Sequence, residues 1–465
     1  MKPVEASSDV EWEYVGAELG DSRLRQRLVQ VAKALDLEPG ASIPDAMETD
    51  AALEGAYRFL GNESVTPDGI LAGHFIEAAA RAETESWVIA VHDTSLFKFG
   101  ETGTRTGLGH LHGKTEGFLG HVSLLVAPGE TRRPLGVLSL QTIVREQPKK
   151  RAKGEKRKRP AFEMRESQRW LRGVEATEQR LAGSSPVVHV MDREGDSFDL
   201  WSALAARGSR FVIRSSHDRR LKEGKISNAL SRVQTVVERT VALTKRPNQK
   251  IEFNQGRYPP RNARLAKLAI GAAKLTLPRP AGAAPGCPET LDLNFVYVRE
   301  VETHGGNAPV EWTLVTTEPV QTSAEIERIV DIYRSRWTIE EYFKAIKTGC
   351  AYEKRQLESF ESLVNALAIF IPIAWRLLLV RTLSRDLSDE PALQALTPDQ
   401  LEVLAAFSHK RLPKNPTVRE AMLAIASLGG HIKNNGDPGW IVLGRGFEKL
   451  LAYELGWQMR AKRDL

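Results

Sequence analysis

The stretch DIYRSRWTIEEYFKAIKTG, residues 331–349, decides how the rest of this 465-residue chain is interpreted. Its apolar and polar positions alternate with a helical period. Upstream of it, Thr322 and Glu325 have the spacing of a capping box, in which each residue satisfies a free backbone N–H of the other at the start of a helix. We therefore expect one long helix that opens at Thr322 and ends near Gly349.

Four polar residues of this stretch share one side of the expected helix. Tyr333, Arg336, Glu340 and Lys347 stand at positions i, i+3, i+7 and i+14. At 3.6 residues per turn they fall within about 60° of arc, so one face carries a phenol, two cations and a carboxylate. A solvated face with an ion pair between Arg336 and Glu340 explains the same pattern, and the helix alone leaves both interpretations open.

Two further carboxylates follow apolar runs that are typical of buried strands. Asp93 follows the run in VIAVHDTS, and Asp192 follows the run in VVHVMDREGDS. A side chain at the end of a strand can leave the sheet and face a cleft while its backbone stays rigidly held. Aspartate is also common in turns, so each residue alone is weak evidence.

The rest of the chain predicts an α/β protein with helical ends. Residues 20–75 have a helical period and are rich in arginine, which indicates a small basic helical domain. A strand, a hairpin, a helix near residues 166–181 and two more strands follow. Residues 217–311 are irregular and β-like, as in an insertion, and the chain after Gly349 is helical with a break near residues 386–398.

The composition fits a folded protein with a polyanionic partner. The formal charge is +6 and the pI is about 9.1, with 42% hydrophobic and 27% charged residues. The run KKRAKGEKRKR, residues 149–159, is too polar to pack, and direct DNA contact and simple solvation both remain open for it. We expect Cys287 and Cys350 to be free thiols in a reducing compartment.

Targeting signals are also informative. The N-terminus lacks a charged segment followed by an apolar one, so we expect no signal peptide. Residues 365–380 are apolar, but they are few and include Pro372 and Arg376, so we expect a buried helix there instead of a membrane span. These features favour a cytoplasmic protein with no membrane partner.

The sequence resembles the cut-and-paste DDE transposases of bacterial insertion sequences, of the Tn-five transposase type, over nearly its whole length. The signature of this insertion-sequence-four group is Tyr, two residues, Arg, three residues, Glu, six residues and Lys. Tyr333, Arg336, Glu340 and Lys347 satisfy every interval. Other segments that look like the family are LGDSRLRQRLV, EGAYRF, the DRE that begins at Asp192, RFVIRS and LAIASLGG.

The resemblance implies an RNase H-like catalytic core with a β-strand insertion, flanked by helical N-terminal and C-terminal domains. We expect a DNA-binding domain over residues 1–75, a catalytic domain over 76–385 and a dimerisation domain over 386–465. The gap between Asp192 and Glu340 is too long for a minimal core. The insertion at about 217–311 accounts for it.

The resemblance also implies the chemistry. Asp93, Asp192 and Glu340 are expected to bind two Mg²⁺ ions, with Mn²⁺ as a substitute, because Mg²⁺ prefers oxygen ligands. By resemblance, Asp93 contacts both ions and the other two carboxylates contact one each. Tyr333, Arg336 and Lys347 are expected to bind phosphates beside the scissile bond; no base is read by such contacts.

Two more DNA contacts are predicted less directly. Members of the family cut both strands through a DNA hairpin and flip a base, which requires an aromatic platform. Trp312 is the candidate by its place in the motif order, although it also begins an apolar strand and could be a core tryptophan. Arg214, at the end of RFVIR, is a candidate phosphate contact.

The implied partners are double-stranded transposon-end DNA, target DNA and a second copy of the chain. The active species would be a homodimeric synaptic complex associated with the bacterial nucleoid. Two alternatives remain: a stand-alone endonuclease or resolvase of the same fold, and a relative that binds ends without cutting. Short inverted repeats in the flanking DNA would distinguish these, because only a mobile transposase needs them.

Overall fold

A computed structural model describes residues 10–100, 105–112, 115–145, 165–243, 245, 260–301, 309–386, 389–394, 396–432 and 438–461. The basic run at residues 149–159, considered above for DNA contact, lies outside the described residues. By its internal contacts the chain divides into two compact units. The first comprises residues 1–156, 175–186 and 337–465, and the second comprises residues 157–174 and 187–336.

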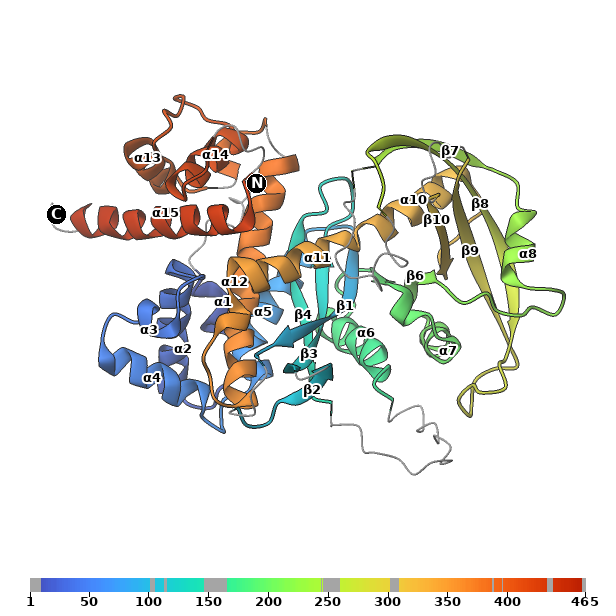
Figure 1. Ribbon diagram of the computed structural model, residues 1–465, viewed down its shortest axis with the longest axis horizontal. Helices are drawn as coiled ribbons and strands as arrows, with labels where there is room; N and C mark the ends of the chain where they lie inside the picture. Colours follow the sequence, from blue (N-terminus) through green and yellow to red (C-terminus); the bar gives the residue numbers. More distant parts are fainter. Residues whose placement is uncertain are drawn as a thin grey trace. The chain divides into compact units, whose positions relative to one another are not determined.

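The first unit combines a small antiparallel sheet with most of the helices (Figure 1). Its strands are β1 (Val88–Lys98), β2 (Gly109–His112), β3 (Thr115–Val126) and β4 (Pro134–Ile143). Strand β3 pairs antiparallel with β1, β2 and β4. Its helices are α1 (Trp12–Val15), α2 (Ser22–Leu37), α3 (Ile43–Ala46), α4 (Asp50–Leu60), α5 (Pro67–Ala82), α11 (Trp337–Lys344), α12 (Phe360–Asp386), α13 (Pro398–Phe407), α14 (Val418–Leu428) and α15 (Trp440–Ala461).

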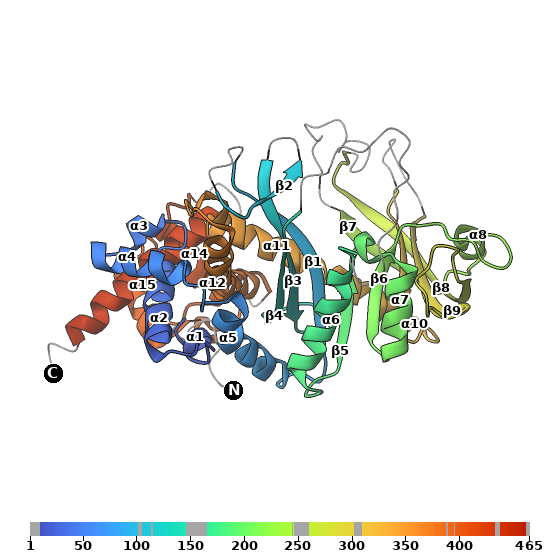
Figure 2. The ribbon, with the colours of Figure 1, turned by 90° about the horizontal axis from the view of Figure 1, so that it is seen from below.

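The predicted N-terminal helices form because their ends are capped. Asp21, Thr49 and Thr66 accept hydrogen bonds from the first-turn N–H groups of α2, α4 and α5 respectively. The apolar stripe of α2 is buried, at Leu28 and Leu35 among others. Helices α5 and α12 pack on β4, and Figure 2 shows α2, α4 and α15 beside α12.

Helix α12 is the apolar segment that the sequence marks as a buried helix. The segment Phe360–Leu383 is long and apolar enough to cross a membrane, but its most apolar 18-residue window is fully buried inside the protein. Trp375, Tyr342 and Tyr14 donate side-chain hydrogen bonds to the carbonyls of Pro134, Ile371 and Ile369 respectively, so this helix is bonded to β4, α11 and α1. The prediction of a buried helix is confirmed.

The second unit is built on a sheet in the order β5-β6-β10-β9-β8-β7. Its strands are β5 (Val187–Met191), β6 (Arg210–Ser215), β7 (Val237–Leu243), β8 (Arg264–Pro278), β9 (Thr290–Glu300) and β10 (Glu311–Thr316). Strands β5 and β6 are parallel, and the other pairs are antiparallel. Strands β7, β8 and β9 lie within residues 217–311, the span in which we expect a β insertion.

Helices cover the sheet of the second unit. They are α7 (Phe198–Arg207), α8 (Ile226–Ser231) and α10 (Ser323–Arg334), and the start of α6 (Gln168–Leu181) belongs here too. Phe211 and Ile213 of β6 share a core cluster with Trp201 of α7. Val212, which points to the opposite side of the sheet, is also buried, so both faces of β6 are covered.

The expected long helix from Thr322 to Gly349 is interrupted. The capping box of Thr322 and Glu325 is present and opens α10, which ends at Arg334. Ser335 and Arg336 then form a turn, whose N–H groups donate to carbonyls three residues earlier, before α11 begins. Residues Ala345–Gly349 form a π-helix. The prediction of one regular helix was therefore wrong. The turn at Ser335 and Arg336 is tighter than an α-helical turn and the π-helix is wider, so each changes the direction in which the following side chains point.

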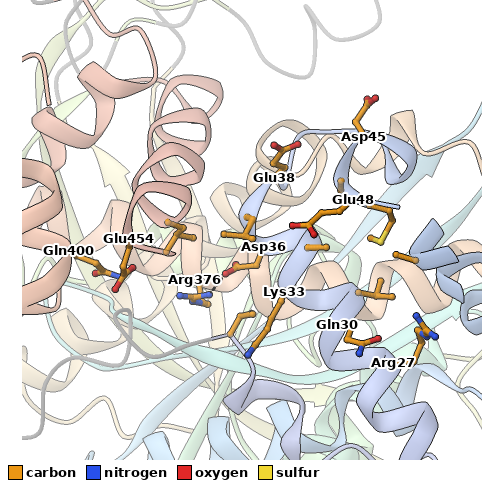
Figure 3. Close-up of a pocket in the computed structure, with 18 of the residues that line it drawn as sticks. Arg27, Gln30, Lys33, Asp36, Glu38, Asp45, Glu48, Arg376, Gln400 and Glu454 are labelled. Carbon is orange, nitrogen blue, oxygen red and sulfur yellow. Dashed lines mark hydrogen bonds and ion pairs between the residues drawn. The ribbon is translucent and has the colours of Figure 1, made fainter. Parts of the chain in front are cut away.

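A cavity of about 930 Å³ lies in the first unit (Figure 3). It is enclosed by α2, α3, α12, α13 and α15, and its lining contains six acidic side chains against three basic ones. The acidic residues are Asp36, Glu38, Asp45, Glu48, Asp399 and Glu454. This excess of negative charge disfavours DNA phosphates. None of the predicted catalytic residues lines the cavity, so the candidate site lies elsewhere.

Candidate active site

Asp93 lies within β1, opposite Val122 of β3, and is half-buried. One of its oxygens, Oδ1, accepts the Thr94 N–H at 2.7 Å. The strand continues to Lys98, so the expectation that Asp93 ends a strand was wrong. The apolar run ends at Asp93 because the strand leaves the buried part of the sheet there, while its pairing with β3 continues.

Two buried histidines flank Asp93 and were not predicted. His92 shares a 2.8 Å hydrogen bond with Ser123, and His121 shares a 2.9 Å hydrogen bond with Thr94. The two rings stack with centroids 6.1 Å apart. Both bonds join β1 to β3 on either side of Asp93. These two hydrogen bonds hold the backbone of Asp93 in place from both sides.

Glu340 is half-buried in the first turn of α11, a helix that packs on β1. Lys347, in the π-helix that follows, donates from Nζ to the Leu96 carbonyl of β1 at 2.5 Å. Its ammonium also lies 3.6 Å from Glu353 and 5.3 Å from the Phe97 ring centroid. Burial lowers the pKa of Lys347. The lysine thus ties the end of the helix that carries Glu340 to the strand that carries Asp93.

In the second unit, Asp192 directly follows β5, as predicted. Its Oδ1 accepts the Glu194 N–H at 2.8 Å and so caps a short 3₁₀ turn, Arg193–Gly195. The carboxylate is half-buried. Because β5 and β6 are parallel, with Met191 opposite Ile213, Asp192 leaves the sheet at the same edge as Arg214.

Three of the predicted DNA contacts gather in the second unit. The Trp312 and Tyr333 rings meet edge to face with centroids 5.4 Å apart. The Arg214 guanidinium carbon lies 5.9 Å from the Trp312 ring, and its Nη2 donates to the Glu311 carbonyl at 3.2 Å. Trp312 is only partly buried, whereas Tyr333 is buried. A partly exposed indole supported by a buried phenol differs from an ordinary core tryptophan.

The charges around Tyr333 have opposing effects. Burial raises the pKa of its phenol, the positive charges of Arg336 and Arg214 lower it, and the negative charge of Asp192 raises it. Arg336 is itself buried, with 8% of its surface exposed. The phenol therefore stays protonated and able to donate, next to two cations.

The three predicted carboxylates offer only oxygen donors, which suits a hard divalent cation and not Zn²⁺ held by sulfur or nitrogen. Asp93 and Glu340 belong to the first unit and Asp192 to the second. Within the part of the chain that the structure describes, no group of three or more His, Cys, Asp and Glu side chains is placed to hold a metal ion. The assignment of these residues as metal ligands stays a prediction.

Comparison with known protein families gives two matches. Residues 8–65 match the family of transposase DNA-binding domains, and residues 149–373 match the transposase DDE domain. Together the two matches support a DDE-family transposase. The predicted α/β fold with an RNase H-like core and helical flanks is confirmed. The DNA-binding match makes DNA its partner, and DDE transposases generally use divalent metal ions.

Most of the candidate site residues lie within the two matched ranges. The DDE match contains Asp192, Trp312, Tyr333 and Glu340 among the candidates, whereas Asp93 precedes its first residue. The transposase DNA-binding match covers α1 to α4, the basic helices recognised from the sequence. The enzymatic class of the transposase therefore rests on the DDE match, and the role of Asp93 rests on the sequence pattern.

Proposed function

We propose that this transposase carries out cut-and-paste transposition, by nicking one strand at each transposon end, forming a hairpin and transferring the freed end to target DNA. Asp93, Asp192 and Glu340 would together bind two Mg²⁺ ions, with Mn²⁺ as a substitute. The observation that carries the proposal is the DDE match, which contains two of these carboxylates and the whole spacing from Tyr333 to Lys347.

Each carboxylate is held by its backbone in a way that suits a ligand. Asp93 is fixed by the pairing of β1 with β3, and Asp192 by its own 3₁₀ turn. Glu340 lies on α11 against β1. Two divalent ions, when bound, would activate water and stabilise the departing oxyanion of a phosphodiester. The role of the chain is to present oxygen donors whose positions do not change during the reaction.

The cations beside the carboxylates would hold the DNA backbone. Arg336 and Lys347 supply positive charge, and Tyr333 supplies a hydroxyl that remains a donor because burial raises its pKa. Such groups bind phosphate oxygens and position the strand without selecting a sequence. Arg214, whose guanidinium lies at the same edge as Asp192, would add a further phosphate contact.

Trp312 would receive the flipped base that hairpin formation requires. Its ring is partly exposed, and the edge contact with Tyr333 holds it in one orientation. Stacking of a base on an aromatic ring contributes about 1–3 kcal/mol. The same stacking energy would offset the loss of stacking when a base leaves the duplex.

We further propose the assembly that the family resemblance implies. Residues 1–75 would bind the transposon end, residues 76–385 would cut it, and residues 386–465 would join two copies into the synaptic homodimer. The dimer would act on the nucleoid in the bacterial cytoplasm. This segment contains α13, α14 and α15, and the apolar side chains Phe407 and Tyr453 on it are exposed.

The test is cleavage of DNA that carries the element's own end, with and without Mg²⁺, resolved on a denaturing gel. Glu340→Ala should abolish nicks and hairpins while end binding is retained. Glu341→Ala is the matched control, because this neighbour on α11 pairs with Lys344 at 2.7 Å and with Arg381 at 3.6 Å and is not an assigned ligand, so its variant should cut normally. Metal-dependent cutting that survives Glu340→Ala would exclude the assigned site. Binding without cutting in the wild type would favour a non-cutting relative, and cutting at DNA lacking the ends would favour a resolvase.

A further inference from the structure

Asp196 lies four residues after Asp192 and is fully removed from solvent, with 0% of its side chain exposed. Its Oδ2 accepts the backbone N–H groups of Ser216 and His217 at 2.6 and 2.8 Å. The same oxygen accepts from His217 Nδ1 at 2.8 Å and from the Ser216 hydroxyl at 3.2 Å. Its Oδ1 pairs with Arg219. One buried carboxylate thus gathers the loop that follows β6.

This carboxylate is committed to partners within the protein. The loop donors all bond to Oδ2, Arg219 pairs with Oδ1, and none of the side chain is exposed to solvent. Arg219 Nη2 donates to the Asp196 backbone carbonyl at 3.0 Å, and its guanidinium lies 4.2 Å from the Trp201 ring centroid. Asp196 therefore differs from Asp192, whose side chain is half-exposed and bonded by a single backbone N–H in its own turn.

The position of Asp196 connects two strand ends. The 3₁₀ turn between Asp192 and Asp196 packs tightly on the sheet, since a Cβ added at Gly195 would lie 2.9 Å from Met191 Cβ. The indole of Trp201 donates to the Gly195 carbonyl at 3.1 Å, which holds the turn from the other side. The loop bound by Asp196 begins directly after Arg214. The Asp196 carboxylate therefore links the turn after β5 to the loop after β6.

We propose that Asp196 is a positioning residue, which holds the turn of Asp192 and the exit of Arg214 in one fixed geometry for metal binding and strand cutting. The inference rests on the proposed function of Asp192 and Arg214. Asp196 would touch neither metal nor DNA. The buried charge is retained because it binds two backbone N–H groups and an arginine at once, which no neutral side chain of similar size can do.

The first experiment measures the loop directly, by amide hydrogen exchange of the metal-free protein. Asp196→Asn should raise exchange in residues 214–219 and 193–196. Asp199→Asn is the matched control: this aspartate is also buried and pairs with an arginine, Arg165, but it accepts the N–H of Ala284 at 2.9 Å, in another loop. Its variant should raise exchange near Ala284 and leave residues 214–219 unchanged.

The second experiment measures Mn²⁺ dependence of cutting, together with end binding, on the same proteins. Asp196→Asn should raise the Mn²⁺ concentration for half-maximal nicking about tenfold and lower the single-turnover rate about 10- to 100-fold, with end affinity unchanged. A merely structural role would lower the active fraction and leave the half-maximal Mn²⁺ concentration as in the wild type. Asp199→Asn should show that second behaviour.

If Asp196→Asn does not fold, His217→Ala provides the test, because the His217 side chain is 68% exposed and its removal deletes one donor without leaving a buried charge unpaired. It should change exchange and Mn²⁺ dependence in the same direction by a smaller amount. Unchanged exchange at 214–219 and an unchanged Mn²⁺ midpoint in a folded variant would overturn the inference alone. Wild-type protein that never cuts its ends would instead remove the proposed function, and this inference with it.

Discussion

Replacing Arg81 tests whether a buried ion pair holds the N-terminal helix α1 to the body of the first unit. Arg81 of α5 donates to both carboxylate oxygens of Glu13, at 2.9 and 3.1 Å, and each side chain is only 3% exposed. Its Nε donates to the Leu135 carbonyl of β4 at 2.6 Å, and its guanidinium lies 4.0 Å from the Trp375 ring centroid. His74 bonds the same carboxylate.

Arg81→Met would leave the Glu13 carboxylate buried with His74 as its remaining partner. Removing one member of a buried pair costs about 3–5 kcal/mol, because the other charge stays desolvated. The pKa of Glu13 gives a second estimate: it is lowered from 4.5 to about 2, despite burial, by His74 and Arg81. That difference corresponds to about 3 kcal/mol of stability at neutral pH. This second figure includes the effect of His74, which remains in Arg81→Met, so it is an upper limit for the part due to Arg81.

Hydrogen exchange of α5 and β4 amides is the assay. Arg81→Met should accelerate their exchange by about two to three orders of magnitude at pH 7. Arg133→Met is the control, since its pair with Glu85 also spans 2.9 Å but both side chains are about a quarter exposed, and such pairs contribute under about 1 kcal/mol. Adding Glu13→Gln to Arg81→Met should restore part of the loss. Equal exchange in Arg81→Met and Arg133→Met would refute the reasoning.

Acidification should act on the same network. The folded pKa of Glu13 is depressed, so its contribution is complete above pH 4.5 and is lost as the pH falls toward about 2. The Val137 N–H donates to His74 Nε2 at 2.9 Å, so neutral His74 carries its proton on Nδ1 and donates to Glu13. Burial lowers the pKa of His74, so its protonation also opposes folding. Protection of α5 should therefore fall first, through His74, as the pH drops below the ordinary histidine pKa of 6.5, and more steeply, through Glu13, below pH 4.5. Glu13→Gln should flatten that steep part.

Three other predictions concern the DNA-cutting residues and the N-terminal segment. Trp312→Ala should leave the first nick intact and reduce hairpin formation about 5- to 150-fold, whereas Trp312→Phe should retain most of it, as seen on denaturing gels. Lys347→Met should slow single-turnover nicking about 10- to 100-fold, and Lys344→Met, which removes an exposed lysine of α11, should change it less than twofold. Arg355→Met should raise hydrogen exchange near Pro39, whose carbonyl accepts a 2.5 Å bond from this buried arginine; unchanged exchange would contradict that role.

Local sequence patterns predicted the elements of this fold better than their ends. Thr322 and Glu325 have a spacing that only a helix start uses, and the structure places the capping box there. Asp93 was expected at a strand end because the apolar run stops at it. Hydrophobicity reports burial, however, and β1 stays paired with β3 beyond its buried part. The residue at which the pairing of a strand ends therefore cannot be located from its hydrophobic pattern.

The contacts that organise the candidate site are mostly between distant segments, and sequence reasoning missed them for that reason. Asp196 stands just before α7, where a short polar residue is commonly a helix cap. The structure gives Ser197 the cap position and directs the Asp196 carboxylate to residues 215–219 instead. The pairing of His92 with Ser123 likewise depends on the register of β1 on β3. A short polar side chain can cap a helix, sit in a turn or bond to a distant segment. Its role can be assigned only when its hydrogen-bond partner is known.

The interrupted helix changes what the spacing of Tyr333, Arg336, Glu340 and Lys347 means. On one regular helix these residues would share a face by periodicity alone. Here Tyr333 lies in α10, Arg336 in the turn, Glu340 in α11 and Lys347 in a π-helix. Arg336 is also the last residue of the second unit. The intervals are therefore not a product of helical geometry. Each reflects a separate constraint: burial of the phenol against Trp312, a tight turn that buries the guanidinium, and a widened turn that brings the ammonium to the Leu96 carbonyl.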